Sequence, residues 1–417
     1  MENQYKAIEA IKKKLVGKQL NYREIFALMD EIGHKRLGPI LTTYFVAASF
    51  KEGFSPDELY FLTKAMVETG EKLKFKGIVA DKHSTGGVPG TRTTMIVVPI
   101  IAATGIKIPK NSSRAITSPS GTADTMEVLS PVSFSPSQTK KIVEKTGGCI
   151  VWGGHLGLAP ADDIIIQVEE PLAFESFDKI IVSIMAKKVA VGATHLVLDI
   201  PVGPTVKIKH FKDAEIIAKK FKYLGKKFKI KISIDTNQAL EPAGRGIGPV
   251  LEVRDVLQVL EQRKNRPLAL EQKALRLSGR LLDLCFADMK DKKGLSGEEV
   301  AREVLENGQA LKKLKEIVSA QSGKSNFSSD KLKLGKYKSK VKSLKKGKVI
   351  AVDSQQMTIV CRILGTPDDK KAGIYLEKRI EEKVDKDDIL YVMYSSSKWK
   401  LKEAKETLKH LSVYKIE

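Results

Sequence analysis

Hydrophobic positions recur at helical spacing through the first 75 residues, and the residues beside them predict where two helices begin. Asn21 can cap a helix that ends near Gly33. A later helix opens with a capping box formed by Ser55 and Glu58, with proline in its first turn. The pattern therefore predicts an all-helical lobe over residues 1–75.

Short apolar runs then alternate with helical patterns, which is typical of an α/β sheet. The expected strands are 149–152, 194–200 and 230–235, the expected helices are 135–148 and 213–223, and a long helical pattern ends the stretch 161–191. The alternation predicts an α/β lobe over 76–160 and 193–330.

The last part of the chain begins with a change in composition. Residues 321–348 are polar and rich in lysine, which predicts a linker or a mobile surface. Strands are expected over 348–353, 357–364 and 388–394, and a closing helix over 400–411. We expect a small α+β subdomain over 331–417.

Length and composition narrow the class of protein. A chain of 417 residues suggests two or three domains, and its 42% of hydrophobic residues is enough to fold them. No apolar run is long enough to cross a bilayer, and the first residues lack a signal-peptide core, so we predict a soluble cytoplasmic protein without membrane partners. Cys149, Cys285 and Cys361 have no metal-ligand spacing, so we predict buried thiols and neither a metal nor a cofactor.

The formal charge of +22 raises the question of nucleic-acid binding. The excess lysine is spread along many segments, aromatic residues make up only 6%, and no nucleic-acid-binding module is recognisable. A solvated lysine-rich surface explains this pattern better, and it would also attract small anionic substrates. We therefore expect no nucleic-acid partner, although a basic binding protein on an inactive enzyme scaffold stays an alternative.

Two loops rich in glycine and hydroxyl groups lie within residues 81–125 and predict an anion site. The first loop frees backbone N–H groups at Gly86, Gly87 and Gly90, and Lys82 adds a full charge. Hydroxyl donors come from both loops: Ser84, Thr93, Ser112 and Thr122. Hydroxyls bind an anion without a full ion pair, so the pattern favours a phosphate that reacts and leaves.

Familiar phosphate motifs do not fit this stretch. No Gly-Lys-Ser/Thr follows the glycines, and no strand is expected directly before them, which argues against a P-loop and a dinucleotide fold. Glycine-rich turns that merely join a strand to a helix are also common.

Several motifs resemble those of the thymidine and pyrimidine nucleoside phosphorylase family. The run Lys82-His83-Ser84-Thr85-Gly86-Gly87-Val88 looks like its signature, while Ser113-Arg114-Ala115-Ile116-Thr117-Ser118 and Gly121-Thr122-Ala123-Asp124-Thr125-Met126-Glu127 resemble its archaeal-type AMP phosphorylase branch. The likeness extends through Leu158–Asp162, Ser183–Lys188 and Gly244–Glu252. The resemblance implies that residues 161–192 complete the helical lobe, that the active-site cleft lies between the lobes, and that the helical lobe forms a homodimer.

The resemblance also assigns residues to substrates. Inorganic phosphate would contact Lys82, Ser84, Gly87, Thr93, Ser112 and Thr122. The nucleotide would contact His83, Gly87, Ser113, Arg114, Ala115, Ile116, Thr117, Ser118, Thr122, Ser183, Lys187 and Lys207. The residues themselves agree in part, since Ser183 and Lys187 are one helical turn apart and the Arg114 fork suits a second phosphate.

Two departures from the relatives bear on the reaction. Glu175 falls where AMP phosphorylases place an aspartate that acts as the proton donor, and a longer acid is unusual there. Val168 falls where pyrimidine phosphorylases place a base-contacting arginine, so pyrimidine recognition loses a donor. We expect phosphorolysis of AMP to adenine and ribose 1,5-bisphosphate, or of a related nucleotide to its own base. A thymidine or pyrimidine nucleoside phosphorylase is the alternative.

Overall fold

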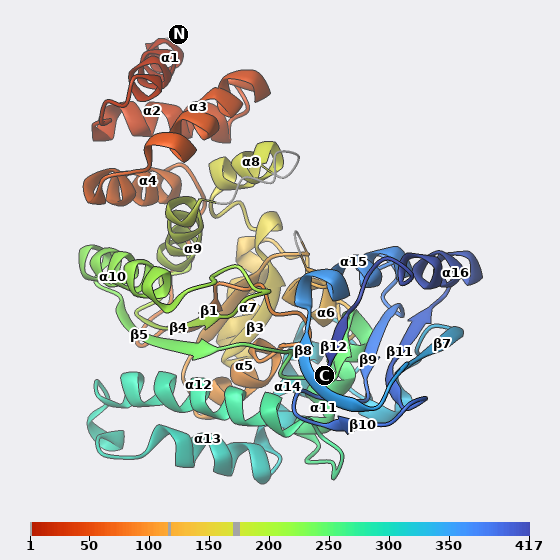
Figure 1. The fold of residues 1–417 in the computed structure, drawn as a ribbon. Helices are drawn as coiled ribbons and strands as arrows, with labels where there is room; N and C mark the ends of the chain where they lie inside the picture. The colour runs from red at the N-terminus through yellow and green to blue at the C-terminus, as the bar shows by residue number, and fades with distance from the viewer. Residues whose placement is uncertain (1, 116–117, 170–175) are drawn as a thin grey trace.

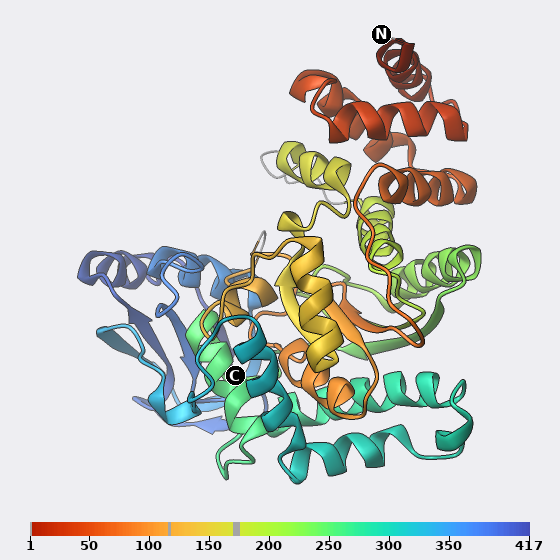
Figure 2. The same cartoon turned by 180° about the vertical axis from the view of Figure 1, so that it is seen from behind.

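The computed structural model describes residues 2–115, 118–169 and 176–417 of the chain. An all-helical lobe lies at one end, an α/β lobe follows it, and a C-terminal subdomain lies beside the α/β lobe (Figures 1 and 2). The predicted fold class, a small helical lobe with a larger α/β lobe and a C-terminal α+β subdomain, is confirmed. None of the described helices is both long and apolar enough to cross a membrane.

The helical lobe contains the first four helices and two that return to it later in the chain. These are α1 (Glu2–Leu15), α2 (Tyr22–Gly33), α3 (Gly38–Glu52), α4 (Pro56–Glu68), α8 (Pro160–Glu169) and α9 (Phe177–Ala190). Both predicted caps are present, because Asn21 Oδ1 accepts from the Glu24 N–H at 3.1 Å and Ser55 Oγ from the Glu58 N–H at 3.2 Å. One apolar cluster joins all six helices, so α8 and α9 pack with α1–α4.

Two parallel sheets form the α/β lobe. The larger has the order β1-β4-β5, with β1 (Ala80–Ser84), β4 (His195–Val202) and β5 (Lys231–Gln238), and the smaller pairs β2 (Ile108–Ser112) with β3 (Gly148–Trp152). The β1 register pairs Ser84 with Asp199 of β4. All eight residues of β4 are buried, which is typical of a parallel strand covered on both faces.

Helices cover these sheets and fill the space between them. They are α5 (Thr94–Ala103), α6 (Thr122–Met126), α7 (Pro136–Thr146), α10 (Phe211–Phe228), α11 (Pro249–Leu260), α12 (Leu268–Phe286), α13 (Gly297–Glu306) and α14 (Gln309–Ala320), with short turns Gly153–His155 and Lys290–Lys292. In Figure 1, α10 lies on one side of the larger sheet and α12 on the other. Nine of the ten residues of α5 are buried, so it forms the central core element below the first loop.

The C-terminal subdomain is built from antiparallel sheets and two helices. One sheet has the order β6-β9-β11-β7, and the other has the order β10-β8-β12. The elements are β6 (Gly246–Ile247), β7 (Tyr337–Lys342), β8 (Gly347–Val352), α15 (Ser354–Leu364), β9 (Gly373–Leu376), β10 (Lys383–Val384), β11 (Ile389–Ser395), α16 (Lys398–Thr407) and β12 (Tyr414–Ile416), preceded by the turn Ser329–Lys331. Because β6 comes directly before α11, the first sheet joins the subdomain to the α/β lobe.

Three local predictions are wrong. A strand, β1, does lead into the glycines; the pattern hid it because two of its buried residues, Asp81 and Lys82, are charged. Residues 357–364 belong to helix α15 instead of a strand, because Asp353 caps the helix by accepting from the N–H groups of Gln355 and Gln356.

The third correction concerns the lysine-rich stretch 321–348, which is not simply a linker. Residues 337–342 form β7, and lysine alternates there with less exposed residues as expected at a sheet edge. Gln321 is fully buried and holds β3 by accepting from the Ile150 N–H at 2.9 Å and donating to the Ile150 carbonyl at 3.0 Å.

Candidate active site

Lys82 lies at the centre of the predicted phosphate site. Its side chain is 2% exposed, and Nζ donates to Thr93 Oγ1 at 3.0 Å, directly before α5. Burial, helped by the nearby cations Lys273 and Arg92, lowers the Lys82 pKa to about 8 although Asp199 opposes the shift. No described carboxylate lies within ion-pairing distance of Nζ, so the charge faces a hydroxyl and is available to an anion.

The glycine loop wraps around the end of β1. Gly86 and Gly87 have positive φ values of 84° and 89°, which favour glycine, and the Gly86 N–H donates to Ser84 Oγ at 3.3 Å. A Cβ on Gly87 would lie 2.7 Å from the backbone nitrogen of Lys207. The structure thereby brings together Gly87 and Lys207, two residues that the sequence assigned separately to the nucleotide.

The second loop is tied to the first by an arginine that sequence analysis missed. Arg92 donates to Thr122 Oγ1 at 2.9 Å and to the Ser120 carbonyl at 2.6 Å, and it pairs with buried Glu252 of α11 at 2.6 Å. Thr122 therefore already accepts a hydrogen bond, while Ser112 Oγ is buried without a partner among the described residues. The only hint in the sequence was that Arg92 is the one arginine of the first loop.

Arg114 is engaged by carboxylates in this structure. Its guanidinium pairs with Asp124 at 3.0 Å and with Glu127 at 2.7 Å, and it lies 5.0 Å above the Trp152 ring. The pKa of Glu127 falls to about 2, chiefly because of its hydrogen bond to Arg114. A second phosphate could use the Arg114 fork only by displacing these carboxylates, and the assigned nucleotide contact stays a prediction.

The other residues of the second loop have mainly structural contacts. The Ser113 carbonyl accepts from the Ala123 N–H at 3.3 Å, and the Ala115 N–H donates to Asp124 Oδ2 at 2.7 Å. Ser118 Oγ donates to the Ser120 carbonyl at 3.0 Å. Ile116 and Thr117, which carry nucleotide predictions, lie outside the described residues.

Ser183 and Lys187 of α9 are brought together as their spacing predicts. Asp162 of α8 joins them, accepting from Ser183 Oγ at 2.7 Å and pairing with Lys187 Nζ at 2.7 Å. Beside it, burial raises the Asp163 pKa to about 6. Asp162 lies in the motif Leu158–Asp162 without a predicted role, and the structure places it against both predicted base-side residues. Val168 packs against the apolar core of the helical lobe.

His83 lies on the opposite side of β1 from Lys82. Its Nδ1 is buried without a hydrogen-bond partner among the described residues. Burial lowers the His83 pKa well below its usual range, and Lys188 and Lys110 add to this effect, so the imidazole is neutral near pH 7. It can therefore hydrogen-bond to substrate but brings no charge.

The predicted acid, Glu175, lies outside the described residues, which resume at Ser176 just before α9.

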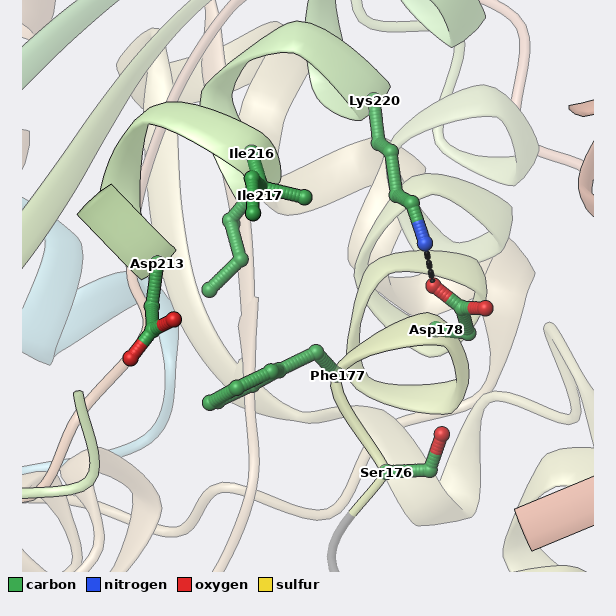
Figure 3. Close-up of a pocket in the computed structure, with 7 residues that line it drawn as sticks. All are labelled: Ser176, Phe177, Asp178, Asp213, Ile216, Ile217 and Lys220. Atoms are coloured by element: carbon green, nitrogen blue, oxygen red, sulfur yellow. Dashed lines mark hydrogen bonds and ion pairs between the residues drawn. The ribbon is translucent and has the colours of Figure 1, made fainter. Parts of the chain in front are cut away.

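Figure 3 shows a pocket between the start of α9 and α10, lined by Ser176, Phe177, Asp178, Asp213, Ile216, Ile217 and Lys220. None of these seven was predicted as a site residue. A smaller cavity shares Phe177 and Ile217 with it and reaches Thr85 and Lys207. No described group of three or more His, Cys, Asp or Glu side chains is arranged to hold a metal ion.

Family comparisons agree with this architecture. Residues 76–311 match the α/β domain of a glycosyl transferase family, residues 8–70 match its helical bundle domain, and residues 348–415 match the pyrimidine nucleoside phosphorylase C-terminal domain. The chain therefore belongs to the pyrimidine nucleoside phosphorylase family of glycosyl transferases.

Individual relatives refine the class. The chain is 42% identical to an AMP phosphorylase of Methanococcus vannielii over 400 residues, covering 95% of this chain and 78% of that protein. It is 39% identical to a putative thymidine phosphorylase of Methylococcus capsulatus, covering 98% and 78%. Among solved structures, anthranilate phosphoribosyltransferase from Thermus thermophilus has a TM-score of 0.59 at 19% identity over 75% of this chain and 99% of that one, which shows a shared fold.

Proposed function

We propose that the protein is an AMP phosphorylase, a pentosyltransferase that converts AMP and inorganic phosphate into adenine and ribose 1,5-bisphosphate. The observation that carries the proposal is the buried Lys82–Thr93 pair at the end of β1, in a chain 42% identical to an AMP phosphorylase. A buried ammonium beside hydroxyls and glycine N–H groups suits an anion that must react and be released. We place this activity in the cytoplasm.

In the proposed reaction an oxygen of inorganic phosphate forms a bond to the anomeric carbon of the ribose. The bond from that carbon to adenine breaks, its electron pair passes to the base, and Glu175 supplies a proton to the purine. The attacking phosphate is held by Lys82, Ser84, Gly87, Thr93, Ser112 and Thr122. Ser183 and Lys187 face the base, and neutral His83 contacts sugar or base. Much of the rate would come from holding the two reactants in line and excluding water.

The acid assignment predicts a specific pattern of kinetic losses. Glu175→Gln should keep the fold but lower turnover of AMP by about a hundredfold to ten-thousandfold, because an amide cannot deliver a proton. Glu175→Asp should retain more activity than Glu175→Gln, because aspartate can still deliver a proton. A substrate with an already good leaving group should be affected much less by the Gln change, so equal losses on good and poor leaving groups would contradict the assignment.

Thymidine or pyrimidine nucleoside phosphorolysis is the second candidate, favoured by the likeness to a putative thymidine phosphorylase. Against it, Val168 occupies the place expected for a base-contacting arginine and packs with apolar neighbours of the helical lobe. An apolar side chain there gives a pyrimidine no charged donor.

A phosphorolysis screen separates these functions. The purified protein is incubated with inorganic phosphate and each of AMP, CMP, UMP, adenosine and thymidine, and release of free base is measured. We expect adenine from AMP as the main product. Faster release of thymine would support the second candidate, and no base release together with salt-sensitive oligonucleotide binding would support a nucleic-acid-binding protein.

We also propose a homodimer formed through the helical lobe. Ile40 and Tyr44 lie one turn apart on α3 and are 73% and 54% exposed, so an apolar face is uncovered in the single chain. A second copy of the chain would bury it. Light scattering after size exclusion should give a dimer, and Ile40→Glu should shift it towards a monomer.

A further inference from the structure

The face of β1 that carries Lys82 also meets a buried carboxylate. The register pairs Ser84 with Asp199 of β4, and paired residues of neighbouring parallel strands point to the same face. Lys82 shares that face with Ser84 because the two are two positions apart in the strand. Asp199 is only 1% exposed. Its carboxylate is therefore a competitor, within the protein itself, for the ammonium that is expected to bind inorganic phosphate.

A lysine of α12 holds this carboxylate. Lys273 Nζ pairs with Asp199 Oδ1 at 3.1 Å and donates to Asn237 Oδ1 at 3.0 Å. Asn237, at the end of β5, donates from Nδ2 to the same Asp199 oxygen at 2.8 Å. Lys273 is itself buried. Among the described residues, the ion-pair partner of Asp199 is thus Lys273 of α12 and not Lys82.

The charge of Lys82 depends on groups from several elements. Burial lowers its pKa to about 8, Asp199 opposes this shift, and the cations Lys273 and Arg92 add to it. Asp81 also acts on Lys82, but it points to the opposite face of β1. Burial would raise the pKa of Asp199, yet Lys273 and Lys82 outweigh burial and hold that pKa below its usual range. Asp199 is therefore ionised, and it is the anion on the Lys82 face.

We propose that Lys273 is a positioning residue of the phosphate site, because it holds Asp199 and thereby leaves the Lys82 ammonium to inorganic phosphate. The inference rests on the proposed function. Without Lys273 the buried carboxylate would need another cation, since an unpaired buried charge is strongly destabilising. Lys82 lies on the same face, and its flexible stem can turn from Thr93 towards Asp199. Phosphate would then have to displace a carboxylate before it could bind.

Calorimetric titration of Lys273→Met with inorganic phosphate, in the absence of nucleotide, tests the proposal. We expect binding at neutral pH to weaken about ten- to a hundredfold, as for loss of a hydrogen bond to a charged group. In the wild type the affinity should fall above the Lys82 pKa of about 8. In the variant this fall should move to higher pH, because a cation is removed and a carboxylate is freed. A merely structural defect would weaken binding without moving the fall.

A double variant and a matched control sharpen this test. Lys273→Met combined with Asp199→Asn removes the competing carboxylate together with its partner, so phosphate affinity should return to near that of the wild type. Arg276→Met is the control, because Arg276 lies one turn further along α12 and pairs at 3.0 Å with Asp235, which Arg280 also contacts at 3.4 Å. We expect the control to leave phosphate affinity and its pH dependence unchanged.

Several outcomes would overturn the inference. An unmoved alkaline fall in Lys273→Met would do so, as would a double variant that binds phosphate as weakly as Lys273→Met. If circular dichroism shows that Lys273→Met does not fold, Asp199→Asn alone decides. It removes the charge that raises the Lys82 pKa, so the fall should move to lower pH, and an unmoved fall would exclude the competition.

The same titrations separate this inference from the proposed function. If phosphate binding responds to these variants as expected and the wild-type protein releases no base from AMP, the positioning role stands and the phosphorylase function fails. If base is released while phosphate binding ignores Lys273, the function stands and the positioning role fails. Absence of phosphate binding and of base release in the wild type would overturn both.

Discussion

The two loops of the site hold their cations in opposite ways. Lys82 of the first loop is almost fully buried and donates to a neutral hydroxyl. Arg114 of the second loop is about one third exposed and is paired with Asp124 and Glu127. A buried ammonium without a counter-ion, such as that of Lys82, is destabilised until an anion binds beside it. The guanidinium of Arg114 is already neutralised by its paired carboxylates. We infer that the first loop is prepared to bind an anion, whereas the second loop is held in shape by its own ion pairs.

Among changes to the two loops, the largest effect should follow removal of the Lys82 ammonium. Lys82→Ala should lower turnover at saturating nucleotide by about a hundredfold to a thousandfold and weaken the response to inorganic phosphate, because it removes the buried ammonium that donates to Thr93 beside the hydroxyls and N–H groups of the site. Initial rates across phosphate concentrations check this. Wild-type phosphate dependence in the variant would refute the phosphate assignment of the first loop.

Removing the ion pairs of the second loop should instead lower the free energy of unfolding. Arg114→Ala leaves Glu127 and Asp124 without their main partner, so we expect a loss of roughly 1.5–3 kcal/mol in the free energy of unfolding, typical of hydrogen bonds to charged groups. KM for inorganic phosphate should change little. Denaturant unfolding and phosphate kinetics are measured on the same samples. A large rise in phosphate KM with unchanged stability would reverse the roles of the two loops.

The difference in unfolding free energy between wild type and Arg114→Ala should also depend on pH. The pKa of Glu127 is lowered from 4.5 to about 2 in the folded protein, chiefly by Arg114, so the contribution of the pair is fully present above pH 4.5 and is lost as pH falls towards 2. The gap in unfolding free energy between wild type and Arg114→Ala should therefore narrow as the pH is lowered below about 4.5. A constant gap over this range would show that the arginine stabilises the loop by packing on Trp152.

The Lys82 ammonium of the first loop should instead make the activity depend on pH in the alkaline range. Because the Lys82 pKa is lowered to about 8, the ammonium is present below that pH and is lost above it. We expect kcat/KM for inorganic phosphate to fall above pH 8, approaching tenfold per pH unit, since this ratio reports the free enzyme. Lys82→Arg should keep its charge and shift the fall to higher pH.

Features of the fold and site were predictable from the sequence where the interacting residues are close together along the chain. Caps at Asn21 and Ser55 were predictable because their hydrogen bonds reach only three residues along the chain. The first loop could be identified from its glycines and its lysine, whose roles are local. Arg92 and Asp162 could not be assigned, because their partners Glu252 and Lys187 lie 160 and 25 residues away. Strand β1 was missed for a related reason, since the buried carboxylate of Asp81 is compatible with a strand only once its distant partner, Lys188 of α9, is known.

The smallest effect is expected for a lysine that reaches the second loop from the C-terminal subdomain. Lys370 lies between α15 and β9, and its Nζ pairs with Glu127 at 3.0 Å and Asp124 at 3.5 Å, while its carbonyl accepts from the Val250 N–H at 3.0 Å. It thus adds a second cation to the carboxylates of the second loop, from a part of the chain 246 residues beyond Asp124. Lys370→Met should lower the free energy of unfolding by at most about 1 kcal/mol, because Arg114 still pairs with both carboxylates and the lysine is partly exposed. In the Arg114→Ala background the same change should cost more free energy of unfolding, since it then removes the second of the two described cations that pair with these carboxylates. Additive losses in this double-mutant cycle would mean that the subdomain contacts the loop without stabilising it electrostatically.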